Sequence, residues 1–258
     1  MNKYTQTYFI TNDNMDINYR LTPIGAVMFF QDCFAQYMTT KHVAAFDIIK
    51  ENIFWVVAEF NIEFTDDMPF WSEKIDVEVW ISEASKIKIY ADFELIHNGK
   101  TFAKGNSCWF ILSTETHRPT SVNVVTDKFE TLNKFTLGEH KKFKLDEMNN
   151  IVKTITHKTN LSDIDFNNHV NNKSYIDIAN ATLDREFKLT HNLKSMSVKF
   201  IKESFIDDVL TCTTYTTEGN YKFIHKIKNN DSDICDITTI WEPISNQSDI
   251  SNFKLQIR

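Results

Sequence analysis

The sequence contains little glycine and proline, with five Gly and four Pro among 258 residues. Because these residues mark turns and flexible linkers, most of the chain is predicted to be regular structure. The four Cys lie far apart, at positions 33, 108, 212 and 235. This spacing lacks the paired pattern of a zinc site or a disulfide framework, so each Cys is interpreted as a small core residue.

Positive charge and long apolar runs are also scarce. The formal net charge is −7, which disfavours a nucleic-acid partner because phosphate binding needs clustered cations. No apolar run reaches the roughly 20 residues that span a bilayer, so no membrane span is expected. The polar start, Met1 to Thr5, is unlike a signal peptide, and these features together predict a cytoplasmic protein.

Aromatic residues are abundant, with 21 Phe, eight Tyr and five Trp, and they fit either β-sheet cores or an apolar pocket. Pro23 fits the first turn of a helix that continues at helical spacing to about Met38. Alternating segments then predict strands at 55–64, 74–81, 86–96 and 102–112, with a hairpin turn at Asn98-Gly99. A polar stretch from 118 to 150 is interpreted as a connection.

The second half of the sequence repeats this order in shorter form. A helix is predicted from Asn172 to about Phe187, followed by strands near 194–202, 209–216, 221–228 and 234–241. The segment 16–21 aligns without gaps with 165–170 (165 − 16 = 149), and each copy runs into its helix. The sequence therefore predicts an α+β protein built from two helix-and-antiparallel-sheet units.

Polar residues before the second helix are the candidate site. Asp165 can accept hydrogen bonds, Asn167 has an amide donor, and His169 can donate or shuttle a proton near neutral pH. In extended backbone, this alternating spacing places all three side chains on one face. Residues of this kind also form simple turns and helix caps, and the pattern alone leaves both readings open. In the first copy Arg20 replaces His169, which indicates one working site per chain.

Two segments resemble the acyl-acyl carrier protein (acyl-ACP) thioesterases, which release free fatty acids. Asp165-Phe-Asn-Asn-His-Val-Asn-Asn-Lys-Ser-Tyr175 matches their motif Asp-x-Asn-x-His-Val-Asn-Asn-x-x-Tyr. The segment from Val198 to Leu210 resembles the later region of the family, where a catalytic Glu follows the His by 34 residues, as Glu203 does here. Shorter matches in the first half lie at 55–57, 67–71, 79–80, 91–94 and 107–109.

The resemblance implies a tandem, or double, hotdog fold, in which each half wraps an antiparallel sheet around a central helix. The expected domains are residues 1–140, which hold the acyl-chain pocket and a degenerate site, and residues 141–258, which hold the catalytic residues. The resemblance assigns catalytic roles to Asp165, Asn167, His169 and Glu203, and it implies no metal and no cofactor.

The chain departs from the family in two places. Several members have Cys directly after the Glu, whereas this chain has Ser204, which excludes a thiolate nucleophile and favours Glu203 as a base; a Ser nucleophile stays open. Ala91 precedes Asp92-Phe93 where many members have Arg, so the role of that Arg is in doubt here.

The resemblance implies an acyl-ACP hydrolase of fatty acid biosynthesis, and two alternatives stay open: a hotdog acyl-CoA thioesterase and a non-catalytic lipid-binding hotdog protein. A homodimer is expected only by analogy with other hotdog proteins. Candidate walls of the acyl tunnel are the Phe29-Phe30 helix and the strands around Trp55 and Trp80. Because the carrier protein is acidic, a local basic patch is expected, with contributors among Lys141, Lys142, Lys194, Lys199 and Lys202.

Overall fold

The computed structural model describes residues 2–140, 142–219 and 221–244. The first half contains β1 (Tyr4–Phe9), α1 (Pro23–Thr40), α2 (Ala45–Ile48), β2 (Ile53–Phe64), β3 (Lys74–Ala84), β4 (Ile89–His97), β5 (Lys100–Ser113) and α3 (Asn123–Thr126). The second half contains β6 (Ile151–Lys158), α4 (Asn172–Asn180), α5 (Arg185–Thr190), β7 (His191–Phe200), β8 (Val209–Thr216), β9 (Lys222–Asn229) and β10 (Ser232–Pro243). Short 3-10 helices lie at Asn12–Asn14, Ile49–Glu51 and Leu161–Asp163.

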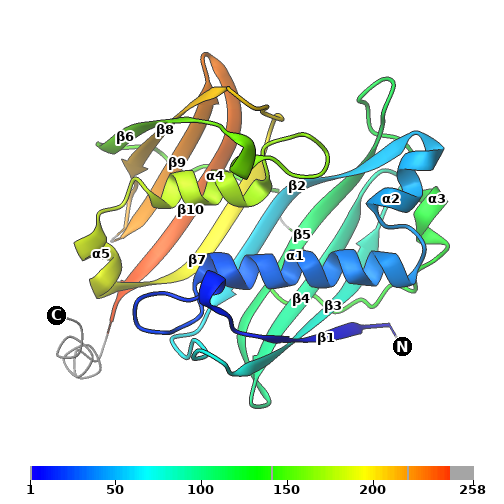
Figure 1. The fold of residues 1–258 in the computed structure, drawn as a ribbon, viewed down its shortest axis with the longest axis horizontal. Coiled ribbons are helices and arrows are strands. Elements are labelled where there is room, and N and C mark those ends of the chain that lie inside the picture. Colours follow the sequence, from blue (N-terminus) through cyan, green and yellow to red (C-terminus); the bar gives the residue numbers. More distant parts are fainter. Residues whose placement is uncertain (1, 141, 220, 245–258) are drawn as a thin grey trace.

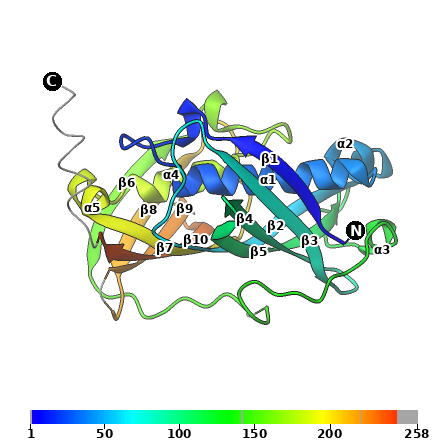
Figure 2. The ribbon, with the colours of Figure 1, turned by 90° about the horizontal axis from the view of Figure 1, so that it is seen from below.

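The strands form one antiparallel sheet in the order β1-β3-β4-β5-β2-β7-β10-β9-β8-β6. The two halves join where residues 59–63 of β2 pair with residues 195–199 of β7. Helices α1 and α4 lie on one face of the sheet (Figure 1), and the connection between the halves runs along the other face (Figure 2). The predicted α+β class, with one main helix for each antiparallel half, is confirmed.

Helix α1 begins where the sequence predicts. The Thr22 hydroxyl accepts a hydrogen bond from the Gly25 backbone N–H at 3.0 Å, and Pro23 occupies the first turn, where a missing N–H costs nothing. The helix continues to Thr40, two residues beyond the predicted end. Its apolar face lies on the first half of the sheet, which fixes the position of the turn that precedes it.

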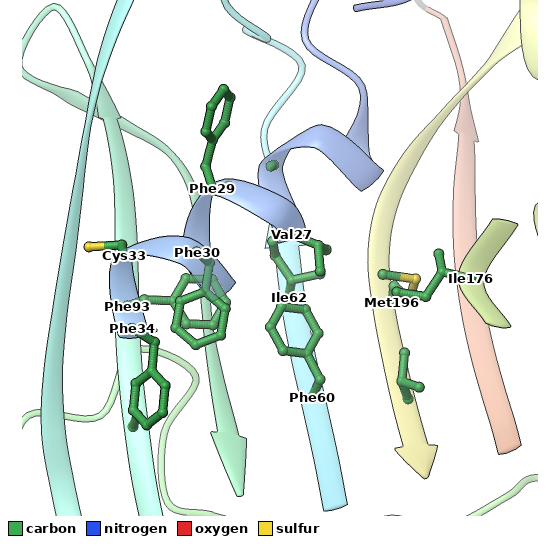
Figure 3. Close-up of a cluster of buried hydrophobic side chains, with 14 of the residues drawn as sticks. Val27, Phe29, Phe30, Cys33, Phe34, Phe60, Ile62, Phe93, Ile176 and Met196 are labelled. Atoms are coloured by element: carbon green, nitrogen blue, oxygen red, sulfur yellow. The ribbon is translucent and has the colours of Figure 1, made fainter. Parts of the chain in front are cut away.

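The core beneath α1 is filled by aromatic rings. Phe30 is completely buried, and its ring centroid lies 3.8 Å from that of Phe93 and 5.3 Å from that of Phe60 (Figure 3). Gly105 makes this packing feasible, because a Cβ there would lie 2.4 Å from the Phe93 ring. Of the two readings of these aromatic residues, core packing therefore holds for Phe30.

The second helix differs from its prediction, because a single helix from 172 to 187 is wrong. Helix α4 ends at Asn180, and α5 begins separately at Arg185. The break is explained by Thr182, whose hydroxyl donates to the Ala179 carbonyl at 2.6 Å and is itself fully buried beside Thr214. A hydroxyl that bonds the carbonyl three residues earlier competes with the backbone hydrogen bonds of the helix at this point.

The sequence predicts eight of the ten described strands and misses β1 and β6. These two are the edge strands of the sheet, and each pairs with one neighbour only. Polar residues interrupt both strands, which have the sequences YTQTYF and IVKTITHK, and no residue of either strand is fully buried. The predicted hairpin turn is confirmed: Asn98 and Gly99 both have positive φ, 49° and 76°, as a type I′ turn requires.

The face of the first half that lies opposite α1 is in contact with the connection between the halves. Trp80 donates its indole N–H to the Lys134 carbonyl at 2.8 Å, on the face opposite α1. Neighbouring residues of β3 alternate between the two faces, so Trp80 itself lies away from α1, and the expectation that its strand forms a wall of an acyl tunnel stays a prediction. The buried Asp92 accepts hydrogen bonds from the backbone N–H and hydroxyl of Thr136, at 2.7 and 2.8 Å, which anchors the connection to the sheet.

The internal repeat extends to backbone detail. The Asp16 N–H donates to the Arg20 carbonyl at 2.8 Å, and 149 residues later the Asp165 N–H donates to the His169 carbonyl at 2.9 Å. The flanking bridges, 15 with 21 and 164 with 170, show the same offset. The helices then begin at 23 and 172. The turn and the start of the helix are therefore structural copies in the two halves, although α1 is longer than α4.

We expect Phe30→Ala to lower the free energy of unfolding by about 3 to 5 kcal/mol, because it removes a completely buried ring between Phe60 and Phe93. Phe46→Ala is the matched control, since Phe46 is 60% exposed and its loss should have little effect. Urea titration followed by circular dichroism measures both values. Equal destabilisation by the two variants would contradict the packing described for Phe30.

Candidate active site

The segment before α4 folds as a tight turn. Residues 164 and 170 form a bridge, and Asn168 at the tip has φ 63°, in the left-handed region that Asn tolerates. One carboxylate oxygen of Asp165 accepts hydrogen bonds from the backbone N–H groups of Asn167, at 2.8 Å, and His169, at 3.4 Å. The expectation of an extended segment with three side chains on one face is therefore wrong, and Asp165 holds the backbone.

Two further contacts fix the ends of this turn. The Asn171 side chain caps α4 by accepting from the Lys173 N–H at 2.9 Å. The Val170 N–H donates to the Ser204 carbonyl at 2.8 Å, which binds the turn to the segment that follows β7. These are the turn and cap contacts that the polar pattern allows, and they bring a second chain segment to the site.

His169 and Glu203 meet at this junction. The His169 Nε2 lies 3.5 Å from a carboxylate oxygen of Glu203, and the ring of Phe205 stands edge-on to the imidazole at 5.3 Å between centroids. The side chains of His169 and Glu203 are 23% and 33% exposed, so both are held by packing and still accessible. An imidazole beside a carboxylate can activate water, move a proton and donate to a developing oxyanion.

The other two candidates lie beside this pair. Asn167 is exposed in the turn, and the hydrogen bond that ties it to the group is made by its backbone N–H. Asp165 acts through the backbone on both Asn167 and His169. Ser204 is completely buried, and its neighbours Glu203 and Phe205 are accessible. This burial disfavours the open alternative of a serine nucleophile, because a substrate carbonyl cannot reach the hydroxyl without rearrangement.

The first copy of the turn lacks this chemistry. Arg20 occupies the position of His169, and its guanidinium donates to the Met68 carbonyl at 2.8 Å. Met68 is also the counterpart of Glu203, because the residues that follow them, Pro69 and Ser204, accept equivalent backbone hydrogen bonds. The first copy therefore keeps the backbone of the turn and has neither the imidazole nor the carboxylate.

A cavity of about 1190 Å³ opens at the first copy of the turn. It is lined on one side by residues from the segments 11–28 and 65–70 of the first half, and on the other by residues of α4 and strands β7, β9 and β10 of the second half. The turn of the first half therefore lies over the cavity between the helix and the sheet of the second half. The near-twofold relation of the copies directs the His169 turn toward the interior of the first half.

The described residues contain no group of three or more His, Cys, Asp or Glu side chains that could hold a metal ion. Cys33, Cys108, Cys212 and Cys235 are each buried as free thiols, as the sequence predicts. Among the helices of the described residues, none has the length and apolar character needed to cross a membrane.

Solved structures define the class of this fold. An acyl-ACP thioesterase from Bacteroides thetaiotaomicron superimposes with a TM-score of 0.83, at 22% identity, over 93% of this chain and 98% of that one. The 12:0-ACP thioesterase from Umbellularia californica superimposes with a TM-score of 0.82, at 18% identity, over 94% and 98%. The expected double hotdog architecture is confirmed.

The sequence identifies the family. Residues 1–129 match the acyl-ACP thioesterase N-terminal domain and residues 146–243 match the C-terminal domain, so the chain belongs to the acyl-ACP thioesterase family. It is 27% identical over 185 residues to the chloroplastic palmitoyl-acyl carrier protein thioesterase of Gossypium hirsutum, covering 67% of this chain and 44% of that protein. It is 26% identical over 216 residues to oleoyl-acyl carrier protein thioesterase 2 of Arabidopsis thaliana, covering 78% and 55%. The chain spans about half the length of the curated relatives it matches.

One buried histidine in the cavity wall gives a pH prediction. Burial lowers the pKa of His225 to about 3, so the folded protein keeps it neutral, whereas an unfolded His takes up a proton near pH 6.5. Its contribution to stability is complete above about pH 6.5 and is lost as the pH falls toward 3. We expect His225→Gln to reduce the acid loss of stability by up to about 1.4 kcal/mol per pH unit in this window.

Urea titrations at several pH values between 4 and 8 measure this slope. His117→Gln is the control, because His117 is exposed. An unchanged slope in His225→Gln would show that His225 is protonated in the folded state.

Proposed function

We propose that the protein is a thiolester hydrolase that releases free fatty acid from acyl carrier protein. The observation that carries this proposal is the accessible His169–Glu203 pair, 3.5 Å apart, in a chain of the acyl-ACP thioesterase family. The curated relatives are named for palmitoyl- and oleoyl-acyl carrier protein, which supports a fatty acyl-ACP thioester as the substrate class.

In the proposed mechanism, Glu203 accepts a proton from a water molecule as that water attacks the thioester carbonyl carbon. The His169 imidazole and the Asn167 amide donate hydrogen bonds to the oxyanion that forms. When the carbon–sulfur bond breaks, the thiolate leaving group takes up a proton from the His169–Glu203 pair, and the fatty acid is released. Asp165 is a positioning residue, because it holds the N–H groups of Asn167 and His169.

Direct attack by Glu203 to form an anhydride is the second route to the same product. We prefer attack by water, because the Glu203 carboxylate is one-third exposed and already faces His169 at one oxygen. Single turnover in H₂¹⁸O distinguishes the routes. Water attack labels the fatty acid only, whereas an anhydride hydrolysed at the Glu203 carbonyl transfers label to the enzyme.

The partner is proposed to be acyl carrier protein. Lys202 is exposed next to Glu203 and is the best-placed of the predicted cationic contacts. Lys194 is already paired with Asp66, at 3.1 Å, so it contributes less; Lys141 lies outside the described residues. Turnover on acyl-ACP and on the matching coenzyme A thioester separates this proposal from an acyl-CoA thioesterase. Failure to hydrolyse any C8 to C18 substrate would favour a lipid-binding protein.

The acyl chain is proposed to enter the first half, toward which the His169 turn is directed, with residues 1–140 as the pocket domain and residues 141–258 as the catalytic domain. A homodimer and a cytoplasmic location stay predictions, and the plant relatives named above are chloroplastic. Sedimentation velocity tests the dimer.

We expect Glu203→Gln to lower kcat by at least about 100-fold, because the amide cannot accept the proton from water. The melting temperature should change little, since Glu203 is partly exposed. Hydrolysis of lauroyl-ACP, followed by thiol release, measures the rate. Ser204→Ala is the matched control at the next residue, and it should keep most of the activity. A loss in Ser204→Ala as deep as that in Glu203→Gln would support a serine nucleophile.

The filled core of the first half predicts a limit on chain length. Phe93 is completely buried between Phe30 and Phe60, so little depth is left for a long acyl chain. We expect Phe93→Leu to raise the ratio of C16 to C8 turnover several-fold, because it vacates space in front of Gly105. A panel of acyl-ACP substrates measures the ratio. The same ratio in Phe93→Leu and the wild type would contradict a chain that enters this half.

A further inference from the structure

The cavity of the second half exists because small or polar residues replace the aromatic rings of the first half. Ala179 lies 149 residues after Phe30, at the equivalent position of the helix. Asn61 of β2 pairs with Ser197 of β7 at the centre of the sheet. The same steps through the strand pairing lead from this centre to Phe93 in β4 in the first half and to His225 in β9 in the second half, so these two residues occupy equivalent positions. The two rings that stack at 3.8 Å in the first half are therefore absent in the second, and the space is about 1190 Å³.

Two buried polar atoms in the cavity wall have no hydrogen-bond partner among the described residues: Nε1 of Trp241 and Nε2 of His191. Trp241 is more than nine-tenths buried, and its indole N–H can only donate. The Nδ1 of His191 lies 3.1 Å from the Phe187 carbonyl, which can only accept, and 2.9 Å from the Thr190 hydroxyl, which itself donates to a helix carbonyl. The proton is therefore assigned to Nδ1, and Nε2 is an acceptor. Since unpaired buried polar groups are rare, this donor and this acceptor indicate a ligand.

A third polar group lies deeper, and its directions can be assigned in the same way. The Thr182 hydroxyl donates to the Ala179 carbonyl, so it accepts from Thr214, which in turn accepts from Nδ1 of His225 at 2.7 Å. Nε2 of His225 then accepts from the Thr239 hydroxyl at 3.0 Å. The oxygen of Thr239 keeps acceptor capacity, and Ile237 and Trp241 of the same strand also line the cavity.

The charges at the cavity do not favour an anionic ligand. The lining includes three cationic residues and five Asp: Arg20, Lys173 and Lys188, with Asp13, Asp16, Asp66, Asp67 and Asp177. Arg20 donates to the Met68 carbonyl, and Lys173 lies 3.6 Å from Asp177, so these cations are already engaged. An acidic carrier protein or a fatty carboxylate gains little from this surface.

We propose that this cavity is a second binding site, separate from the His169–Glu203 pair, for an uncharged amphiphile with a hydroxyl or amide group on an apolar chain. The head group accepts from the indole N–H of Trp241 and donates to Nε2 of His191 or to Thr239, while the chain lies against α4 and β10. The site is reached past Arg20, in the copy of the turn that lacks the catalytic side chains.

The test uses octan-1-ol as the probe and sodium octanoate at pH 8 as its charged counterpart. In ¹H–¹⁵N spectra of the full chain, we expect octan-1-ol to shift the indole N–H resonance of Trp241, which is assigned by its loss in Trp241→Phe. Octanoate should shift it at least tenfold less effectively. A resonance that does not respond to octan-1-ol, or responds equally to octanoate, overturns the proposal.

Two variants locate the binding by calorimetry. Ala179→Phe places the first half's ring in the cavity and should abolish octan-1-ol binding at this site. Trp241→Phe removes the N–H and keeps most of the ring, so affinity should fall about three- to tenfold, the value of one hydrogen bond. If Ala179→Phe fails to fold, Trp241→Phe alone still tests the proposed site. Wild-type affinity in folded Trp241→Phe refutes the assignment, and unchanged thioester hydrolysis in that variant is expected if the sites are separate.

Discussion

The pairing of β2 with β7 is the contact on which the rest of the structure depends. It joins two copies of one unit into a single sheet, with residues 59–63 opposite 195–199 in antiparallel register. This register relates the copies by a near-twofold rotation, so the turn of each copy is directed toward the interior of the other. Under the proposed function, the turn of the second half depends on the first half to hold the substrate.

The two turns share one backbone conformation and differ in the side chains that they present. Both are held by an Asp carboxylate that accepts from the N–H groups two and four residues later. At the last of these positions, His169 faces Glu203, whereas Arg20 donates to the Met68 carbonyl. The Asp is needed to form the turn in either case. Its presence in both copies agrees with a positioning role and not a chemical one.

The sequence predicts most of the fold because local signals and tertiary packing agree there. Pro23 and the apolar spacing after it mark α1, and Asn98-Gly99 marks a hairpin. The predictions are wrong or absent where a distant contact decides: β1 and β6 are strands because they pair with β3 and β8, and Thr182 contacts β8 where α4 has ended. At the site, only the separation of His and Glu in the family motif identifies Glu203, since no local sequence pattern connects it with His169. The cavity could not be predicted, because it depends on which residues face Ala179 across the layers.

The space between helix and sheet is filled in the first half and open in the second, and each arrangement has a physical cost. The first half fills its core with Phe30, Phe60 and Phe93, which stabilises the unit and leaves little room for a chain. The second half keeps His225 neutral within a chain of threonine hydroxyls, an arrangement less favourable than an apolar core unless every group is paired. That network is fully paired, but Nε1 of Trp241 and Nε2 of His191, elsewhere in the cavity wall, have no hydrogen-bond partner among the described residues. A core that only stabilised the fold would gain from closing this space, so its polar, open state argues for a function in binding.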